Sequence, residues 1–516
     1  MGSPPEPTPS ELVAETRSLQ FKGNSDLAKS TKFLIQHRER LSHYRFIDDL
    51  VLDAFDPEAV DRQLDLKDAK AMVHHLTTVR AAIARVVWTR QMFIGISVLD
   101  ELLFNSVRSA TADTDDPVLQ VFETIVARDL FYPGVVVYPL YGFGVLGAGL
   151  IKVLTSTHLS LLASEFGFVV SPQTNSMQAT IAFLNDACEL LGVRKPVPTE
   201  SLEHWQRSRP AQWLTRNPLL VARVTSVPGD YYENQFLLLD RLRTIASFLA
   251  MLAARQDVAP GPEETVFSSA RINNFQTLDI KHYMVLSDVP ADEDELYGDF
   301  VPMNASVAAL AELSDLPIEF YPDHWIGNLV DARRIYEAVN YVYERGLETS
   351  FGPPGETKEA QVYRKLARSL VHFRRSFSTS DEDWQGTLSL AIAFETLLTD
   401  GYSAGVRSRV SRRIRLLLSD RLDVESLAKE VEQMYSRRGG LMHGADVDGS
   451  GRNPKAQAVF VDTFVAVAER LPSMLPLAPP DAPLRYICGD NTAPPAASFL
   501  GDLLEVFRKH FRRSAT

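Results

Sequence analysis

The stretch VESLAKEVEQMYSRRGGLMH, residues 424–443, decides the fold class because its apolar residues recur every three or four positions. On an α-helix, residues at this spacing share one face. They are Val424, Leu427, Ala428, Val431, Met434, Tyr435, Leu441 and Met442. The same spacing places Arg438 on that face, where an apolar side chain is expected. The stretch predicts a helix that packs in a bundle and turns one guanidinium toward its neighbours.

Five more segments with helical periodicity surround this stretch. They are residues 331–348, 359–376, 383–400, 405–420 and 454–474. Together they predict an almost purely helical domain over residues 330–475. The Pro-rich run LPLAPPDAP at 475–483 ends this domain, and residues 476–516 predict a linker followed by an amphipathic C-terminal helix.

The preceding part of the chain divides into three by pattern. Residues 1–30 start polar and Pro-rich and predict a flexible arm, and residues 31–128 have the periodicity of a helical N-terminal domain. Residues 129–329 mix β-rich and helical runs, which predicts a mixed α/β middle domain that we interpret as a sensor. The β-rich runs are VVVY at 135–138, FGFVV at 166–170, LLVARV at 219–224 and HYMVL at 282–286, and the helical runs include 177–191 and 231–255. The expected fold class is mainly α with this mixed region in the middle.

Composition narrows the classes of function. The 516 residues are 45% hydrophobic and 23% charged, with a formal net charge of −13, so the chain is globular and lacks a general basic coat. Any polyanion must therefore be met by a local basic patch. With only Cys188 and Cys488, a disulfide framework or an all-cysteine zinc cluster is excluded. The cysteine usage and the N-terminus MGSPPEPTPSELVAET, which has no secretory pattern, favour the cytoplasm.

The uncharged run LFYPGVVVYPLYGFGVLGAGLI, residues 130–151, is long enough to span a bilayer. Its two prolines and five glycines disfavour a membrane helix, so we expect a buried strand and a tight turn, and no membrane partner. GFGVLG at 142–147 matches the dinucleotide fingerprint, but no acid follows the next predicted strand. A packed glycine-rich turn is therefore expected there. Because HExxH and CxxC motifs are also missing, no metal or cofactor is expected.

Glu395 is the natural counter-charge for Arg438. It lies on the predicted helix 383–400, on the same side as Leu388, Ala391, Ile392 and Leu398. Because an unpaired buried charge costs several kcal/mol, we expect the two to form an ion pair. One interpretation is a structural pair that fixes helix register. The other is that Glu395 orients Arg438 where a phosphate binds.

His443 follows Arg438 by five residues, beyond Gly439 and Gly440, which weaken the helix and could bend or end it. Its imidazole can act as acid or base near neutral pH, whereas a histidine at a helix end is also a common C-terminal cap. Upstream, residues 402–421 contain six arginines and one acid. The arginines that point away from the apolar stripe predict a surface that binds the phosphate backbone of a nucleic acid. The ordinary alternative is that they are simply solvated. They are Arg409, Arg412 and Arg415.

Three segments taken in order resemble the ApeA-like branch of the HEPN superfamily (higher eukaryotes and prokaryotes nucleotide-binding). They are FETLLT at 394–399, RSRVSRRIRLLL at 407–418 and MYSRRGGLMHG at 434–444. The shared pattern is an acid in the first helix, a basic R-x-x-x-L-L helix, and Tyr-x-x-Arg followed five residues later by His-Gly. The resemblance covers about residues 330–475, and the region before it resembles no family we recognise.

The resemblance implies a metal-independent endoribonuclease, often a toxin or an antiviral effector. It implies that Arg438 and His443 are the catalytic pair and that Glu395 supports them. In the family a polar residue often follows the motif arginine, whereas this chain has Gly439 at that position. Arg437 could take the place of the missing polar side chain, and we also expect it to contact RNA.

Cutting RNA without a metal needs both a base and an acid, and one chain offers one such histidine. We therefore expect a homodimer through the HEPN helices, which brings two copies of the pair to one groove and leaves a 2′,3′-cyclic phosphate. Two other readings stay open. One is a catalytically silent HEPN module that binds nucleotide, RNA or a partner protein, and the other is a scaffold in which Glu395 and Arg438 are purely structural.

Overall fold

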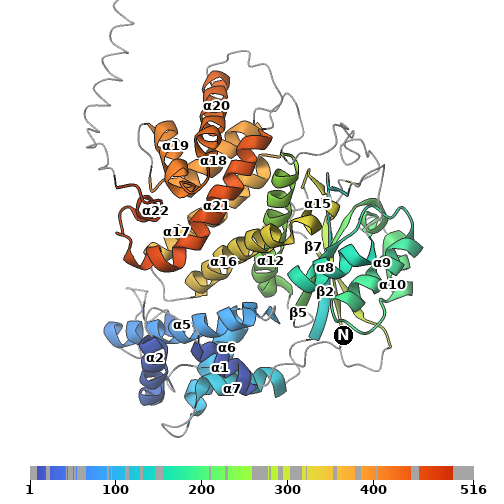
Figure 1. Cartoon of the computed structure of the whole chain (residues 1–516). Helices are drawn as coiled ribbons and strands as arrows, with labels where there is room; N and C mark the ends of the chain where they lie inside the picture. The colour runs from blue at the N-terminus through green and yellow to red at the C-terminus, as the bar shows by residue number, and fades with distance from the viewer. Residues whose placement is uncertain are drawn as a thin grey trace, which may run out of the picture.

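The computed structural model describes residues 9–18, 24–41, 44, 50–51, 54, 65–89, 92–93, 96–110, 116–127, 132–145, 155–207, 211–226, 231–258, 277, 280–288, 294–302, 316–320, 322–351, 357–377, 385–401, 405–442 and 453–491. The fold is mainly α with a small, mostly antiparallel sheet in a mixed middle region, which confirms the expected fold class (Figure 1).

The sheet of the middle region has the strand order β1–β5–β2–β6–β7, and β4 pairs with β5 on the same side as β1. Every pairing is antiparallel except β1 with β5. The strands are β1 (Met92–Phe93), β2 (Tyr132–Pro139), β4 (Phe168–Val170), β5 (Leu219–Ser226), β6 (His282–Ser287) and β7 (Tyr297–Pro302). The four predicted β-rich runs supply β2, β4, β5 and β6, because β-branched and aromatic residues fit a buried pleated surface.

The uncharged run forms a central strand, as expected. Val135, Val136 and Val137 in β2 are fully buried, and a Cβ added to Gly134 would collide with the carbonyl oxygen of Leu286 on β6. The run then turns at Gly142 (φ 72°) and enters β3 (Gly144–Val145), which pairs with β8 (Glu319–Phe320). Gly142 and Phe143 thus form the described part of the predicted packed turn, Gly144 and Val145 belong to β3, and Leu146 and Gly147 lie outside the described residues. No helix in the described part of the chain is long and apolar enough to cross a membrane.

Among the described residues, five helices belong to the middle region with the sheet, and one of them also packs against the C-terminal helices. They are α8 (Ser156–Phe166), α9 (Met177–Leu190), α10 (Thr199–Arg207), α11 (Trp213–Arg216) and α12 (Tyr231–Gln256). The last of these, α12, lies between the sheet and the C-terminal helices and packs against α16, α17 and α21 (Figure 1).

The described part of the N-terminal region is mainly helical, and its first helix begins at residue 9. Its helices are α1 (Pro9–Ser18), α2 (Asn24–Gln36), α3 (Arg38–Leu41), α5 (Leu66–Thr89), α6 (Ile96–Ser109) and α7 (Pro117–Ala127). Leu12 and Thr16 on α1 are buried where this helix packs against α5 and α7. The expectation of a flexible arm is therefore wrong for residues 9–18 and 24–30. The polar composition of the segment hides one apolar face, which a neighbouring helix covers.

The C-terminal half contains the six predicted helices, each displaced by at most a few residues. The helices of this half are α15 (Pro322–Gly327), α16 (Leu329–Phe351), α17 (Lys358–Arg375), α18 (Gln385–Leu398), α19 (Val406–Leu417), α20 (Val424–Met442), α21 (Pro454–Met474), the 3₁₀ turn η3 (Leu475–Leu477) and α22 (Pro483–Ile487). Residues 476–491 were expected to be a linker, but Leu484, Ile487 and Cys488 are buried against the bundle. The amphipathic helix expected near the C-terminus lies outside the described residues.

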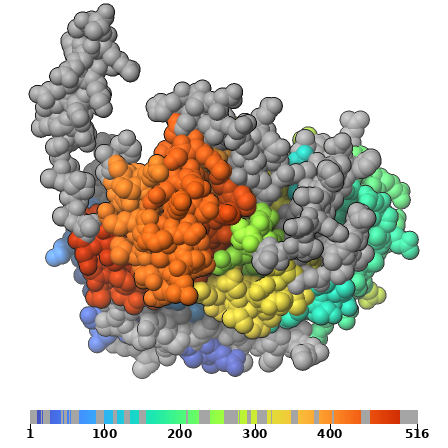
Figure 2. All heavy atoms as spheres, turned by 45° about the horizontal axis from the view of Figure 1, so that its top comes forward, coloured from blue at the N-terminus to red at the C-terminus, as the bar shows by residue number. Residues whose placement is uncertain are grey.

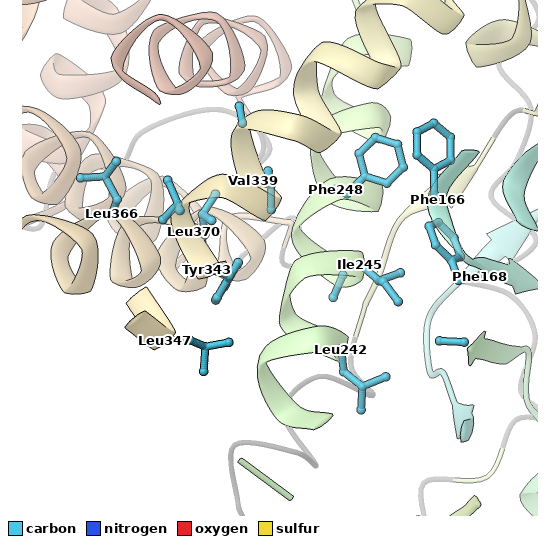
Figure 3. Packing of buried hydrophobic residues seen from close by; sticks show 14 of the residues in the cluster. Phe166, Phe168, Leu242, Ile245, Phe248, Val339, Tyr343, Leu347, Leu366 and Leu370 are labelled. Carbon is cyan, nitrogen blue, oxygen red and sulfur yellow. The ribbon is translucent and has the colours of Figure 1, made fainter. Parts of the chain in front are cut away.

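One hydrophobic core joins the regions that the sequence separated into domains. Its central members run from the sheet side across α12 and α16 to α17 (Figure 3). They are Phe166, Phe168, Leu242, Ile245, Phe248, Val339, Tyr343, Leu347, Leu366 and Leu370. The regions share one core because the second half of α12 is mostly apolar and almost entirely buried, so both the sheet and the C-terminal helices cover it.

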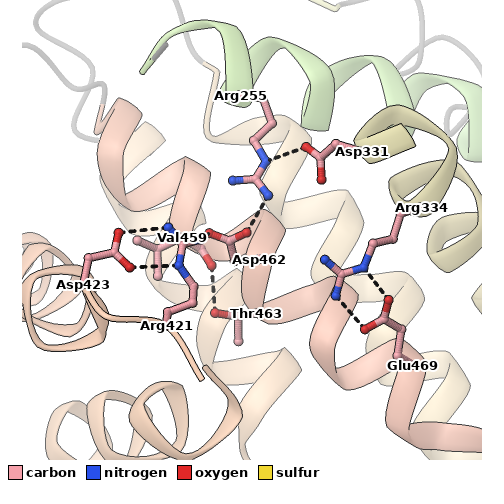
Figure 4. Close-up of polar contacts among 9 residues, drawn as sticks. All are labelled: Arg255, Asp331, Arg334, Arg421, Asp423, Val459, Asp462, Thr463 and Glu469. Atoms are coloured by element: carbon pink, nitrogen blue, oxygen red, sulfur yellow. Dashed lines mark hydrogen bonds and ion pairs between the residues drawn. The ribbon is translucent and has the colours of Figure 1, made fainter. Parts of the chain in front are cut away.

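Ion pairs reinforce this junction (Figure 4). Arg255 of α12 contacts Asp462 of α21 at 2.5 Å and Asp331 of α16 at 3.4 Å. Arg421, before α20, reaches the other oxygen of Asp462, also at 2.5 Å. The carboxylate of Asp462 thus links the middle region to two parts of the bundle.

Candidate functional site

The candidate site lies where α18 and α20 meet. Nη1 of Arg438 lies 3.3 Å from Oε1 of Glu395, so the predicted ion pair between the two helices is present. The Arg438 side chain is 33% exposed and the Glu395 side chain 25% exposed. Both groups therefore reach solvent, and the expectation that they point into the core is wrong.

The packing of α18 explains this exposure. The helix buries Leu390, Phe394 and Leu397, whereas Leu388 and Ile392 remain partly exposed. The periodic pattern of α18 is apolar on more than one face, so it did not identify which face enters the core. Glu395 lies on the outward one, beside Leu388 and Ile392.

Tyr435 packs beneath the ion pair and holds the two helices together. Its ring lies under the guanidinium, with Cζ of Arg438 5.9 Å from the ring centroid, and its hydroxyl donates to the carbonyl oxygen of Ala391 at 3.2 Å. Burial, and then the nearby charge of Glu395, raise the pKa of Tyr435. The phenol stays protonated at neutral pH and acts there as a hydrogen-bond donor and a cation–π partner.

The exposed part of the Arg438 guanidinium is what a ligand could reach. Oε1 of Glu395 and Nε of Arg438 are shielded from solvent and make no hydrogen bond among the described residues, whereas the Arg438 side chain as a whole is 33% exposed. A guanidinium has five N–H donors in a planar fork that matches phosphate oxygens. A partly exposed guanidinium oriented by a carboxylate can therefore bind a phosphate while it remains attached to the protein.

The helix α20 continues through the two glycines and ends at Met442, so they do not break it. Gly439 is exposed, and a Cβ built there would meet no atom within 4 Å. His443 follows directly and lies outside the described residues, so its predicted role stays a prediction.

Arg437 connects α20 to the starts of two other helices. Its Nη1 donates to Oδ1 of Asn453 at 3.0 Å, and Nδ2 of Asn453 donates to Oγ1 of Thr387 at 2.9 Å. Asn453 was not among the predicted residues. Its position before Pro454, which starts α21, is a typical helix N-cap signal and could have drawn attention to it.

Two of the three α19 arginines predicted to bind RNA contact acids. Nη2 of Arg412 lies 2.7 Å from Asp490, and Nε of Arg415 lies 2.8 Å from Glu425. Arg409 is partly exposed, and burial together with the like charges of Arg413 and Arg412 lowers its pKa. The predicted footprint of Arg409, Arg412 and Arg415 is therefore not a row of solvated cations.

Arg413, which the sequence did not single out, is a structural residue. It is 3% exposed, its Nε lies 3.0 Å from Asp490, and its Nη1 donates to the carbonyl oxygen of Leu398. Asp490 lies 77 residues farther along the chain, so no local pattern could have revealed this partner.

No group of three or more metal-binding side chains occurs among the residues that the structure describes. Burial raises the pKa of both cysteine thiols, Cys188 and Cys488, to about 12, which leaves them protonated and unreactive. A functional hypothesis therefore depends on the charged side chains of α18 and α20.

No family model matches the chain, and no curated protein or solved structure matches it significantly. On the face that Figure 2 shows, the C-terminal helices, in orange and red, form a large part of the surface.

Proposed function

We propose that this protein is a metal-independent endoribonuclease of the HEPN type. The observation that carries the proposal is the ion pair of Glu395 and Arg438, which joins α18 to α20 at 3.3 Å and leaves the guanidinium one-third exposed. A buried structural pair would not need this exposure, whereas a phosphate-binding arginine does.

In the proposed reaction, a base removes the proton from the 2′-hydroxyl, and the 2′-oxygen attacks the adjacent phosphorus. An acid protonates the departing 5′-oxygen, so the products end in a 2′,3′-cyclic phosphate and a 5′-hydroxyl. His443 takes these proton-transfer roles, and Arg438 stabilises the charge that develops on the phosphorus-bound oxygens. Glu395 keeps Arg438 oriented.

The proposal includes a homodimer through the HEPN helices, because base and acid then come from two copies of His443. The partly exposed Leu388 and Ile392, beside Glu395, give this part of α18 an apolar surface that a second copy can cover. The cellular role that fits best is a cytoplasmic toxin or antiviral effector, with the N-terminal and middle regions sensing the trigger or restraining the nuclease.

The test is the end-group chemistry of the RNA fragments. Purified protein incubated with total RNA in EDTA should yield fragments with 2′,3′-cyclic phosphate and 5′-hydroxyl ends. Arg438→Ala should remove these fragments, while Arg207→Ala, which changes an exposed arginine on α10, should leave them unchanged. Cleavage that requires a divalent ion, or fragments with 5′-phosphate ends, would contradict the proposal.

A second candidate is a catalytically silent HEPN module that binds RNA, nucleotide or a partner protein. The observation that favours it is Gly439, since no side chain follows Arg438 to complete the site. The open space around Gly439 makes a direct test possible. Under this candidate, wild-type protein binds RNA without cutting it, and Gly439→Asn gains cleavage.

A further inference from the structure

The side chain of Asn453 connects α20 to α18 next to the candidate site. Its Oδ1 accepts a hydrogen bond from Nη1 of Arg437 on α20 at 3.0 Å, and its Nδ2 donates to Oγ1 of Thr387 on α18 at 2.9 Å. Asn453 itself directly precedes α21. Because both ends of the amide are engaged, its orientation is fixed, and it holds the Arg437 guanidinium in one place.

Asn453 does not make the contact that its position predicts. An asparagine that precedes a helix usually accepts a hydrogen bond from a backbone N–H group in the first turn of that helix. The side chain of Asn453 makes no such bond to α21, and only its backbone carbonyl accepts from the N–H of Gln457, at 2.9 Å. The residue is 8% exposed. Its buried amide therefore supports Arg437 rather than the start of its own helix.

Arg437 keeps most of its binding capacity while it is held. The residue is exposed, and its contact among the described residues is with a neutral amide. Arg438, in contrast, is paired with the carboxylate of Glu395. A guanidinium has five N–H donors, and Asn453 uses one of them. The structure thus presents a positive charge in a fixed place, without an acid against it in the described chain.

The two arginines of α20 are suited to different phosphates. Arg437 and Arg438 are consecutive, and successive side chains of an α-helix point about 100° apart. Their guanidinium groups therefore diverge and do not compete for the same phosphate oxygens. Glu395 supports one of them and Asn453 supports the other. Such an arrangement can bind two neighbouring phosphates of one strand.

We propose that Asn453 is a positioning residue, which holds Arg437 against the phosphate next to the scissile one at Arg438. This inference rests on the proposed nuclease function, because it takes RNA as the ligand of α20. Asn453 acts only through Arg437, and Thr387 keeps the amide in its orientation. Since the neighbouring phosphate is not changed in the reaction, Arg437 contributes to RNA affinity and not to the rate of the cleavage step.

The first test measures RNA affinity in full-length His443→Ala protein, so that the RNA stays intact. The ligand is a fluorescent single-stranded RNA of mixed sequence. Asn453→Ala should weaken binding about 3- to 10-fold, the factor that corresponds to ordering one long side chain. Arg437→Ala should weaken it by at least about 10-fold, because it also removes a hydrogen bond between charged groups.

The double change distinguishes positioning from an independent effect. Asn453→Ala combined with Arg437→Ala should bind RNA as Arg437→Ala alone does, because Asn453 acts through that guanidinium. Thr387→Val, which removes the hydroxyl, should weaken binding in the same direction as Asn453→Ala. Thr387→Ser, which keeps the hydroxyl, should restore the affinity of the parent.

Gln457→Ala is the matched control on the same helix. Gln457 is a fully buried amide one turn after Asn453, and its Nε2 donates to the carbonyl oxygen and Oγ of Ser376, directly after α17. Its loss removes buried hydrogen bonds without touching Arg437, so the RNA affinity should equal that of the parent. Thermal unfolding checks that each variant is folded at the temperature of the assay. A purely structural Asn453 would lower the melting temperature, as Gln457→Ala does, without changing the affinity.

The same changes in the wild-type background separate affinity from chemistry. Asn453→Ala and Arg437→Ala should raise the protein concentration at which the single-turnover cleavage rate is half-maximal, while the saturating rate stays within about twofold. Arg438→Ala should instead lower the saturating rate, because that guanidinium stabilises the transition state.

The outcomes distinguish this inference from the proposed function. It is overturned if Asn453→Ala keeps the parent affinity, if its effect adds fully to that of Arg437→Ala, or if the parent binds no RNA. If wild-type protein cleaves RNA and Asn453→Ala keeps the parent affinity, the nuclease stands without this positioning residue. If the coupled loss of affinity is found but wild-type protein cuts nothing, Asn453 positions an RNA-binding arginine and the catalytic proposal fails.

Discussion

At the scale of single residues, Arg438 shows what a charged side chain in an apolar repeat can reveal. The repeat of α20 predicted a partner for it, and Glu395 is that partner. The degree of burial was not predictable, because Leu388 and Ile392 made the outward face of α18 look like a core face. This exposure determines how much the pair can stabilise the fold.

The energy of the ion pair is a testable consequence of its exposure. Glu395→Gln, Arg438→Gln and the double change should give a coupling free energy of about 0–1 kcal/mol in urea unfolding, because solvent screens both groups. A coupling near the roughly 3–5 kcal/mol of broken buried pairs would contradict this and favour the structural interpretation. The same single changes should abolish RNA cleavage despite their small effect on stability.

Gly439 gives a second prediction at this scale. Because it lies inside α20 with open space around it, Gly439→Ala should raise the free energy of unfolding by roughly 0.5–1 kcal/mol by reducing the entropy of the unfolded chain. The control is Gly142→Ala, which should destabilise the protein. Gly142 has φ 72°, and a Cβ added to it would lie 3.0 Å from Cα of Pro317. Equal effects at the two positions would show that α20 does not have this geometry.

At the scale of elements, α19 is fixed to the segment after α22 by Asp490. This carboxylate is 1% exposed and contacts both Arg412 and Arg413, and the Arg413 side chain is 4% exposed. Asp490→Asn should therefore cost about 2–4 kcal/mol, because the buried guanidinium of Arg413 then keeps only its longer contact of 3.6 Å with Asp400. Chemical unfolding measures the loss. Asp423→Asn, which removes a half-exposed partner of Arg421, should cost less than about 1 kcal/mol, and equal losses would refute the argument.

The contact between α2 and α5 should be sensitive to acid. His75 packs on Phe33 and hydrogen-bonds with Ser30 at 3.0 Å, and burial, then the nearby His74 and His37, lower its pKa. The unfolded chain therefore binds a proton more readily than the native state, so stability falls as pH decreases through about 6.5 and levels off below the native pKa.

His75→Gln should reduce this loss, measured as the difference in melting temperature between pH 7.5 and pH 5.5. His204→Gln, at an exposed position of α10, serves as the control and should keep the wild-type difference. A wild-type melting temperature that does not decrease with acid would contradict the assignment.

At the scale of the whole molecule, periodicity predicted elements well and their assembly poorly. The helix α21 has the bounds that the pattern gave, and β2 is the strand expected from the uncharged run. The strand β7 was not predicted, because its sequence YGDFVP has no alternating pattern and depends on pairing with β6. Burial of α1 and the shared core around α12 were missed for the same reason, since each depends on partners distant in sequence.

The same distinction between local patterns and distant partners applies to the candidate site. Glu395 and Arg438 could be predicted because each breaks a local pattern. The engagement of the α19 arginines could not, because Asp490 and Glu432 are supplied by other elements.

The central claim is that one imidazole and one guanidinium per chain cut RNA. The most direct measurement is the single-turnover cleavage rate of wild-type and His443→Ala protein on the same RNA in EDTA. General acid–base catalysis by a positioned side chain contributes typically about 10²–10⁴-fold, so the variant should be slower by at least about 100-fold. A His443→Ala protein that cleaves within about twofold of the wild-type rate would contradict the claim.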